Sequence, residues 1–185
     1  MIDSSVLSWS IGTTAVLALI TADKRIIVAN AGDSRAVLCR GGQAIPLSHD
    51  HKPFIKVEHD RIVGAGGFVQ AGRVNGNLAL SRAIGDHEFK QNTSLPIERQ
   101  MVTCVPDIIS EKIKNDDEFM VIACDGIWDS LSSAEVVQFI KEKIDVGKMK
   151  LDKICEALIM KCVAPSYYHE PGGDNMTVVI VMFKR

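Results

Sequence analysis

The first half of the chain alternates short apolar runs with turn residues. Four runs, TAVLALIT, RIIVANA, RAVLCR and QAIPLS, occupy residues 14–21, 25–31, 35–40 and 43–48. The first is β-branched and apolar, and Asp, Gly or Lys residues separate each run from the next, as expected for strands joined by tight turns. Strands that follow one another so closely usually pair antiparallel. The pattern therefore predicts an antiparallel meander.

The spacing of apolar residues changes after Pro53. Residues 53–67 carry apolar side chains at helical spacing and end in a glycine cluster, which predicts a helix. Residues 68–95 are rich in loop-forming residues and predict only short strands. The strand pattern returns in MVTCVPDIISEKI (101–113) and in DDEFMVIACDG (116–126), where the second run breaks at an Asp-Gly pair.

The last third of the chain predicts two helices and a strand. AEVVQFIKEKI (134–144) follows Ser132 and Ser133, either of which is a suitable N-cap. In LDKICEALIMKCV (151–163), the apolar side chains recur on one helical face. MTVVIVMF (176–183) is apolar on both faces and predicts a central strand, whereas 92–100 and 165–173 predict surface loops. Strands followed by helices and a final strand indicate an α+β fold.

Composition excludes several classes of protein. The 185 residues are 46% hydrophobic and 24% charged, which is typical of one globular domain. A net charge of -2 gives no basic surplus for binding nucleic acid. No apolar run approaches the roughly 20 residues of a membrane span, so we expect no membrane insertion. The five cysteines contain no C-x-x-C pair, and we expect a reduced, intracellular chain.

The cysteines also argue against a thiolate phosphatase. None is followed six positions later by the arginine that would complete an anion-binding loop. We therefore expect Cys124 to be a small buried residue.

Three acidic residues share one setting. Asp33 in NAGDSR, Asp125 in ACDGIWD and Asp174 in GGDNMT each adjoin an apolar strand at a tight turn. Asp favours such turns because its side chain bonds nearby backbone amides, and this explains any one of them alone. If the strand ends converge, however, the carboxylates repel one another unless a cation is present. Oxygen ligands of this kind suit Mg²⁺ or Mn²⁺, and a pair of such ions can activate water to hydrolyse phosphate esters.

An ordered series of motifs resembles a known family. The motifs are GTTAVLALI, VANAGDSRAVL, DHKP, GGFV, GRVNGNLALSRAIGDHEFK, VIACDGIWD and GGDNMTVVIV. They extend from Gly12 to Val181 and are similar to those of the metal-dependent protein phosphatases of type 2C. NTSLPIERQMVTCVPDI further resembles the gamma branch of that family, whose members suggest a cytoplasmic or nuclear setting.

The resemblance implies a fold and a set of metal ligands. The fold is α+β, with two stacked antiparallel sheets flanked by helices. Asp125 and Asp174 resemble core ligands of a pair of Mg²⁺ or Mn²⁺ ions, and Asp33 resembles the acid that binds a third ion together with Asp125. Asp129 and Asn175 are candidates for contacts to the ions through water or hydrogen bonds, with a purely structural role as the alternative.

The same resemblance places RVNG and SRAIGD in or beside a flap at the substrate entrance. Within these segments we expect Arg73, Arg82 and Asp86 to be structural ion-pair partners rather than substrate contacts.

One family motif has no counterpart in this chain. An Asp-Gly-His-Gly-Gly motif upstream of the Gly-Thr-Thr motif carries the family's other metal ligands and a proposed acid. None of the five histidines has that context, and we expect surface or structural roles for His49, His51, His59, His87 and His169. We therefore assign no catalytic residue and expect residues 1–185 to be the C-terminal portion of a single type 2C phosphatase domain, incomplete at its N-terminus.

Two functions remain open at this point. The first is metal-dependent hydrolysis of phosphoserine and phosphothreonine in phosphoprotein substrates, with this chain supplying part of the metal site and showing little activity alone. The second is an inactive phosphatase-like interaction module. Because the missing portion would leave open sheet edges and uncovered apolar faces, we expect the chain to bind an N-terminal portion of the same domain or to self-associate.

Overall fold

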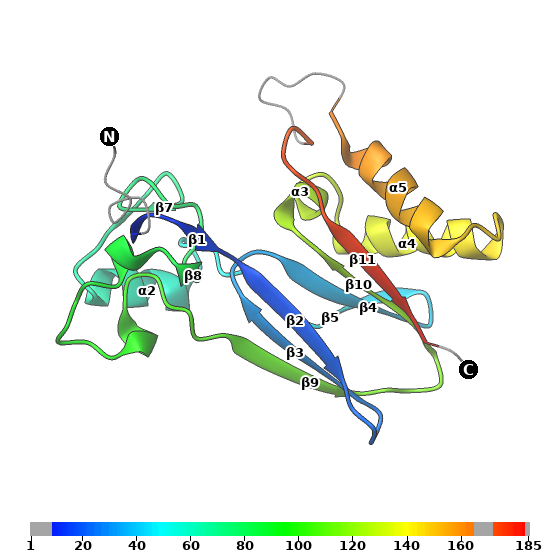
Figure 1. Cartoon of the computed structure of the whole chain (residues 1–185), viewed down its shortest axis with the longest axis horizontal. Coiled ribbons are helices and arrows are strands. Elements are labelled where there is room, and N and C mark those ends of the chain that lie inside the picture. Colours follow the sequence, from blue (N-terminus) through cyan, green and yellow to red (C-terminus); the bar gives the residue numbers. More distant parts are fainter. Residues whose placement is uncertain (1–8, 165–171, 184–185) are drawn as a thin grey trace. The chain divides into compact units, whose positions relative to one another are not determined.

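The computed structural model describes residues 9–164 and 172–183, which form two compact units (Figure 1). The first unit comprises residues up to Leu17, Ala29–Asp33 and His49–Ile108. The second comprises Ala18–Val28, Ser34–Ser48 and residues from Ile109 onward.

A four-stranded antiparallel sheet forms the centre of the second unit. Its strands lie in the order β11-β10-β4-β5. They are β4 (Arg35–Arg40), β5 (Gln43–Pro46), β10 (Asp117–Ala123) and β11 (Val178–Met182). β10 pairs with β4 from Asp117↔Arg40 to Ala123↔Arg35, and with β11 from Phe119↔Met182 to Ala123↔Val178.

Three helices belong to the same unit, namely α3 (Asp125–Trp128), α4 (Ser133–Asp145) and α5 (Leu151–Cys162) (Figure 1). Ser132 begins α4 with a capping box: its hydroxyl accepts from the Glu135 N–H, and the Glu135 carboxylate accepts from the Ser132 N–H. The apolar faces of α4 and α5 pack on one face of the sheet. The buried members of this core are Val37, Cys39, Phe119, Val121, Ala123, Ile127, Trp128, Val136, Val137, Ile140, Ile154, Leu158 and Cys162.

The opposite face of the four-stranded sheet is buried as well. Successive strand residues point to opposite faces, so Ala36, Leu38 and Met120 point away from the helices, and all three are fully buried. A second sheet has the order β2-β3-β9, from β2 (Ala15–Ile20), β3 (Arg25–Ala31) and β9 (Asp107–Lys112). Antiparallel sheets with flanking helices confirm the predicted α+β fold.

The first unit contains little regular structure. Among its described elements are the helix α2 (Lys56–Gly64) and two short sheets, which pair β1 (Gly12–Thr13) with β8 (Ile84–Gly85) and β6 (Val69–Gln70) with β7 (Arg73–Val74). Short 3-10 turns occupy His87–Phe89 and Ile97–Arg99. The buried apolar cluster is small, consisting of Ile62, Val74, Ala83, Phe89 and Val102.

Most predicted elements are confirmed, with two corrections. β11 was predicted as a central strand, but it lies at the edge of its sheet in the part of the chain that the structure describes. The Asp-Gly pair after β10 does not form a simple turn, because Asp125 begins α3 directly. The predicted loop at 165–173 lies largely outside the described residues. No helix within the described ranges is long and apolar enough to cross a membrane.

Candidate functional site

Asp125 and Asp174 lie at the same end of the β10–β11 pair. Ala123 pairs with Val178 in the last register position; Asp125 follows Ala123 by two residues, and Asp174 precedes Val178 by four. The strand register therefore brings together two acidic residues that are 49 positions apart in the sequence.

Cys124 ties these two segments together. Its N–H donates to the Thr177 carbonyl at 3.2 Å, and the Thr177 N–H donates to its sulfur at 3.2 Å. The thiol donates in turn to the Asn175 carbonyl at 3.4 Å. Cys124 was predicted to be a small buried residue, but it is half-buried, and its sulfur contacts backbone polar groups. It thereby fixes the backbone beside both carboxylates.

Gly126 shows how closely the two segments approach. A Cβ atom at this position would lie 2.4 Å from the Asn175 carbonyl oxygen, well inside any normal contact. Glycine is therefore required at position 126 because α3 packs closely against residues 174–176, and not because of the backbone angles of a turn.

The side chains around this end are mostly accessible. Asp174 is exposed, and its Oδ1 accepts from the Asn175 N–H at 2.7 Å. Asp129 and Asn175 are also exposed, and the Asp129 N–H donates to the Asp125 carbonyl at 2.7 Å as α3 ends. The structure thus places four predicted site residues on two adjoining segments. The roles predicted for them stay predictions.

Asp33 belongs to the first unit and has a different environment. It is 4% exposed, and Lys52 Nζ donates to its Oδ2 at 2.5 Å. His51 stabilises the turn that precedes Asp33. The His51 N–H donates to the Gly32 carbonyl at 3.0 Å, and the His51 Nδ1 lies 3.2 Å from the Gly32 nitrogen. The DHKP motif therefore neutralises and positions Asp33. Participation of Asp33 in one site with Asp125 stays a prediction.

His51 connects this turn to a buried ion-pair network. Its Nε2 lies 3.1 Å from Asp107 Oδ2, and Arg82 Nη1 donates to Asp107 Oδ1 at 2.7 Å. Arg82 also donates to Glu58 Oε1 at 2.7 Å. Arg82 therefore forms ion pairs, as predicted, and His51 is buried with hydrogen-bond partners on both ring nitrogens. That neither residue acts in catalysis or contacts a substrate stays a prediction. Arg73 and Asp86 form no ion pair among the described residues, and burial raises the pKa of the Asp86 carboxyl.

Glu58 is the centre of this network and is only 1% exposed. It accepts from Arg82, from Ser81 Oγ at 2.5 Å and from Arg61 Nη1 at 2.7 Å. Burial raises the pKa of Glu58, but these donors outweigh burial and lower it to about 2. The sequence analysis missed Glu58, Lys52 and Asp107. Among these contacts, the Glu58–Arg61 pair is the one whose i,i+3 spacing is visible in the sequence of a predicted helix.

The carboxylates at the end of β10 and β11 suit a hard cation but do not complete a site. Among residues 9–164 and 172–183, no three His, Cys, Asp or Glu side chains form a group that could hold a metal ion. Mg²⁺ and Mn²⁺ require more oxygen ligands than Asp125 and Asp174 supply, although water can provide several.

Comparisons with known proteins agree with the motifs and the fold. The family model for "Protein phosphatase 2C" matches residues 1–169. The chain is 54% identical over 174 residues to "Probable protein phosphatase 2C 21" of Arabidopsis thaliana, covering 94% of this chain and 48% of that protein. It is also 54% identical over 173 residues to "Protein phosphatase 2C homolog 2" of Schizosaccharomyces pombe, covering 93% of this chain and 46% of that protein.

A solved structure supports the same assignment. Over 86% of its length the chain resembles a phosphatase crystal structure from a pathogenic strain of Toxoplasma gondii, with a TM-score of 0.77 and 35% identity, and the match covers 48% of that chain. The chain thus spans about half the length of the curated relatives that it matches. Because the family model covers most of its residues, the chain belongs to the protein phosphatase 2C family.

Proposed function

We propose that this chain is the C-terminal portion of a metal-dependent protein serine/threonine phosphatase domain and supplies part of its metal site. The observation that carries the proposal is the junction at Gly126. There the backbone of α3 packs against residues 174–176 and brings Asp125 and Asp174 to one end of the sheet. Family membership supports hydrolysis of phosphoserine and phosphothreonine in phosphoproteins.

The proposed ligands are oxygen donors. Asp125 and Asp174 would bind Mg²⁺ or Mn²⁺ directly, and Asp129 and Asn175 would hold water molecules around the ions. When bound, a pair of such ions supplies an activated water for attack on phosphorus. The family resemblance alone supports Asp33 as a ligand of a third ion. In this proposal the Lys52 ammonium group pairs with the Asp33 carboxylate until a metal cation takes the place of the ammonium group.

The remaining ligands would come from the other half of the domain. The chain covers about half of its relatives, and the described residues form no complete metal group. We therefore propose that an N-terminal portion of the domain, in the same or a separate chain, completes the site. A cytoplasmic or nuclear location and kinship with the gamma branch belong to the same proposal.

The test is hydrolysis of a phosphothreonine peptide with and without Mn²⁺. The chain would be assayed alone and after mixing with the part of the Schizosaccharomyces pombe relative that lies outside the 173 matched residues. We expect little turnover alone and Mn²⁺-dependent turnover in the mixture. Asp125→Ala and Asp174→Ala should each abolish it, whereas Asp152→Ala, which changes an exposed acid on α5, should not. Calorimetric titration of the mixture with Mn²⁺ should show weaker binding for the first two variants.

Two results would contradict the proposal. Turnover that persists in a metal chelator would exclude the metal-dependent reaction. A stable mixed complex that binds no Mn²⁺ and hydrolyses no phosphopeptide would favour the alternative function, an inactive phosphatase-like interaction module.

A further inference from the structure

α3 is too short to set its own orientation. It spans only Asp125–Trp128, a single turn, and Asp129 follows as its C-cap. Helices shorter than about 12 residues are marginal in water unless other parts of the protein support them. The two acids proposed to act at the metal site stand at the two ends of this turn. The direction of both carboxylates therefore depends on contacts that α3 makes with the rest of its unit.

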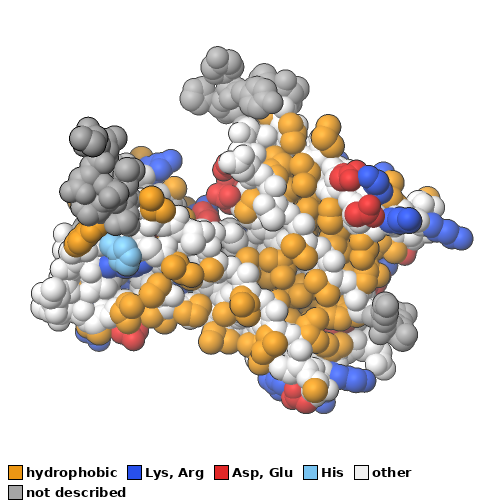
Figure 2. All heavy atoms as spheres, in the orientation of Figure 1, with side chains coloured by type: hydrophobic (Ala, Val, Ile, Leu, Met, Phe, Trp, Pro, Cys, Tyr) orange, Lys and Arg blue, Asp and Glu red, His pale blue; other side chains and the backbone are white. Residues whose placement is uncertain are grey.

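Apolar packing holds α3 against the sheet but does not fix its rotation. Ile127 is fully buried and belongs to the core between the sheet and the helices. Hydrophobic side chains also gather over the part of the molecule that carries β10 and β11 (Figure 2). Burial of apolar surface is non-directional, so it stabilises many rotations of a short turn almost equally. Directional contacts are needed to select one of them.

Trp128 makes the first directional contact. Its side chain is 7% exposed, and its Nε1–H donates to the Ala123 carbonyl at 2.8 Å. An indole has one donor and no acceptor, so this bond is specific for one orientation of the ring. Ala123 is the last residue of β10. The bond therefore ties the end of α3 to the strand from which α3 starts, and Asp125 lies between the two bonded residues.

Arg35 makes the second directional contact, from a neighbouring strand. It is the first residue of β4 and pairs with Ala123 in the sheet. Its guanidinium carbon lies 5.1 Å from the centre of the Trp128 ring, and its Nη1 donates to Ser133 Oγ at 3.0 Å. Trp128 ends α3, and Ser133 begins α4. One side chain thus contacts the chain on both sides of Asp129.

The chemistry of arginine suits this double contact. A planar guanidinium can lie over an aromatic ring and donate hydrogen bonds from its edge at the same time. The attraction between a cation and an aromatic ring extends to about 6 Å, and it strengthens where water is excluded. Lysine would keep the charge but lose the planar group. The arginine of the NAGDSR segment therefore has a use that is separate from that of Asp33.

The packing of α3 leaves little room for another rotation. Gly126 lies so close to the Asn175 carbonyl that a Cβ atom would be 2.4 Å from it. β10 lies between β4 and β11, so α3 is held by Arg35 from one neighbouring strand and by the segment before β11 from the other. A change in the rotation of α3 would break this packing and move Asp125 relative to Asp174.

We propose that Arg35 is a positioning residue of the proposed metal site. By stacking on Trp128 and bonding to Ser133, it fixes the rotation of α3. Fixed in this way, α3 directs Asp125 and Asp129 toward the segment that precedes β11. This role rests on the proposed function, because only that function makes the carboxylates metal ligands. Arg35 acts through α3 and is not itself a ligand.

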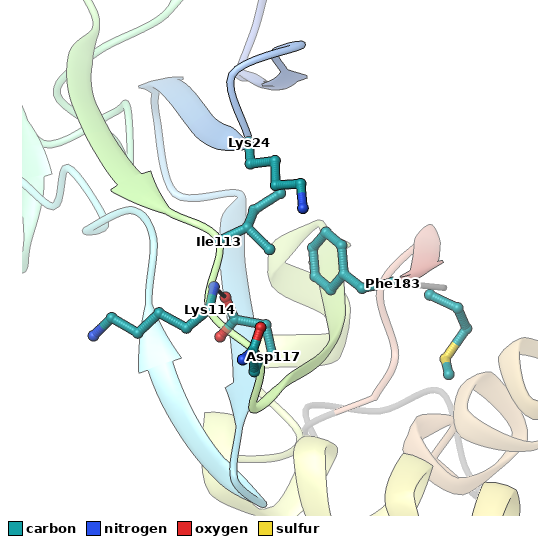
Figure 3. A pocket seen from close by; sticks show the side chains of 7 residues that line it. Lys24, Ile113, Lys114, Asp117 and Phe183 are labelled. Carbon is teal, nitrogen blue, oxygen red and sulfur yellow. Dashed lines mark hydrogen bonds between the residues drawn. The ribbon is translucent and has the colours of Figure 1, made fainter. Parts of the chain in front are cut away.

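Arg25 offers a matched control. It begins β3 as Arg35 begins β4, and its Nη2 donates to the hydroxyl of Ser110 at 2.7 Å. Among the described residues, it lies over no aromatic ring. The preceding residue, Lys24, lines a pocket of about 750 Å³ together with Asp117, the first residue of β10 (Figure 3). α3 follows the opposite end of β10, so a substitution of Arg25 leaves the contacts of α3 untouched.

The first test measures Mn²⁺ affinity in the mixture that tests the proposed function. Calorimetric titration would compare the unsubstituted chain with Arg35→Met, Arg35→Lys and Arg25→Met. Loss of a residue that orients metal ligands commonly weakens metal binding by about 10- to 100-fold. We expect Arg35→Met to raise the Mn²⁺ dissociation constant at least about tenfold, and Arg35→Lys to raise it less because a cation stays over the ring. Arg25→Met should leave it unchanged.

Turnover of the phosphothreonine peptide provides a second readout. Arg35→Met should lower kcat at a limiting Mn²⁺ concentration and leave KM for the peptide unchanged, because Arg35 does not contact the substrate in this proposal. Added Mn²⁺ should restore kcat, as expected for weakened metal binding. Partial unfolding would instead reduce the number of Mn²⁺ sites per chain in the titration.

Amide hydrogen exchange tests the structural step without any metal. The Asp129 N–H donates to the Asp125 carbonyl at 2.7 Å and closes the turn. In the whole 185-residue chain, Arg35→Met should make the Asp129 amide and the Trp128 indole N–H exchange at least about tenfold faster, since α3 opens more often. The Val121 amide, in the middle of β10, should keep its protection and show that the sheet remains folded.

The outcomes separate this role from the proposed function. Unchanged Mn²⁺ affinity in Arg35→Met would overturn the positioning role even if α3 exchanged faster, because Arg35 would then only stabilise the fold. Unchanged exchange at Asp129, or equal effects of Arg35→Met and Arg25→Met, would overturn it as well. An unsubstituted mixture that binds no Mn²⁺ and hydrolyses no peptide would contradict the proposed function. In that case, faster exchange in Arg35→Met would still support Arg35 as the residue that fixes α3.

Discussion

The two units of the molecule are stabilised in different ways. Among the residues that the structure describes, the second unit has a core of 13 buried apolar residues between its sheet and helices. The described part of the first unit has a cluster of five, together with a buried carboxylate that contacts two arginines. Burial of apolar area stabilises in proportion to the area and tolerates small changes. A buried charge, in contrast, is stable only while each of its partners is present. The stability of the first unit should therefore be more sensitive to the loss of a single polar side chain.

Removal of the central charge should cause the largest loss. Glu58→Ala leaves Arg61 and Arg82 buried without their carboxylate, which should lower the free energy of unfolding by about 3–5 kcal/mol. Urea denaturation measures this loss. Asp60→Ala is the control, because its pair with Lys56 is exposed and should contribute little to stability. Equal losses for the two variants would show that burial does not matter here.

Truncation in the apolar core should cost somewhat less and affect the other unit. Leu158 of α5 is fully buried, and Leu158→Ala should lower the free energy of unfolding by about 2–5 kcal/mol. Hydrogen exchange should show faster exchange in α4 and α5 while α2 keeps its protection. Equal acceleration in α2 would mean that the two units unfold as one. Met160→Ala, at a 72% exposed position of the same helix, is the control.

Acid should weaken the first unit through Glu58. Its pKa is about 2 in the folded chain against 4.5 ordinarily, so its contribution is complete above about pH 4.5 and is lost as pH falls toward 2. The loss from this group should total about 3 kcal/mol. Urea denaturation of the chain and of Glu58→Gln between pH 5 and pH 2 measures it. The variant should be less stable at pH 5 and show a shallower decline. Parallel declines would assign the effect to other carboxyls.

The smallest effect should come from the cap of α4. Ser132→Ala removes the hydroxyl that accepts from the Glu135 N–H and should cost about 1 kcal/mol. Ser132→Thr should retain most of the stability, since Thr is also an N-cap residue and keeps the hydroxyl that donates to Glu135 Oε2. Thermal unfolding of the three proteins is the measurement, and a Thr variant no better than the Ala variant would argue against capping as the cause.

Local patterns predicted most of the elements. The strands at 25–31 and 35–40 follow from short apolar runs bounded by turn residues, and the helix at 151–162 follows from period-3.6 spacing. Both signals depend only on neighbouring residues. The edge position of β11 was not predictable in this way. An apolar run shows that a strand is suited to burial on both faces, but it does not specify which strands pair with it.

The candidate site was predictable in part for the same reason. Asp125 and Asp174 each stand beside an apolar strand in a motif of the family, so the sequence could select them as candidates, and their role as ligands stays a prediction. The Glu58–Arg82 and His51–Asp107 pairs join residues 24 and 56 positions apart, and the sequence holds no local trace of such partners. The sulfur contacts of Cys124 were missed because a cysteine in an apolar run usually indicates simple burial.

The close approach of two chain segments depends on the absence of a side chain at Gly126. Any side chain there would press on the Asn175 carbonyl, so α3 and residues 174–176 would have to move apart. A single added methyl group would thus separate the two acids while leaving both of them in place. Among descendants of this sequence, we expect selection to act on this glycine as strongly as on the acids, although it carries no functional group of its own.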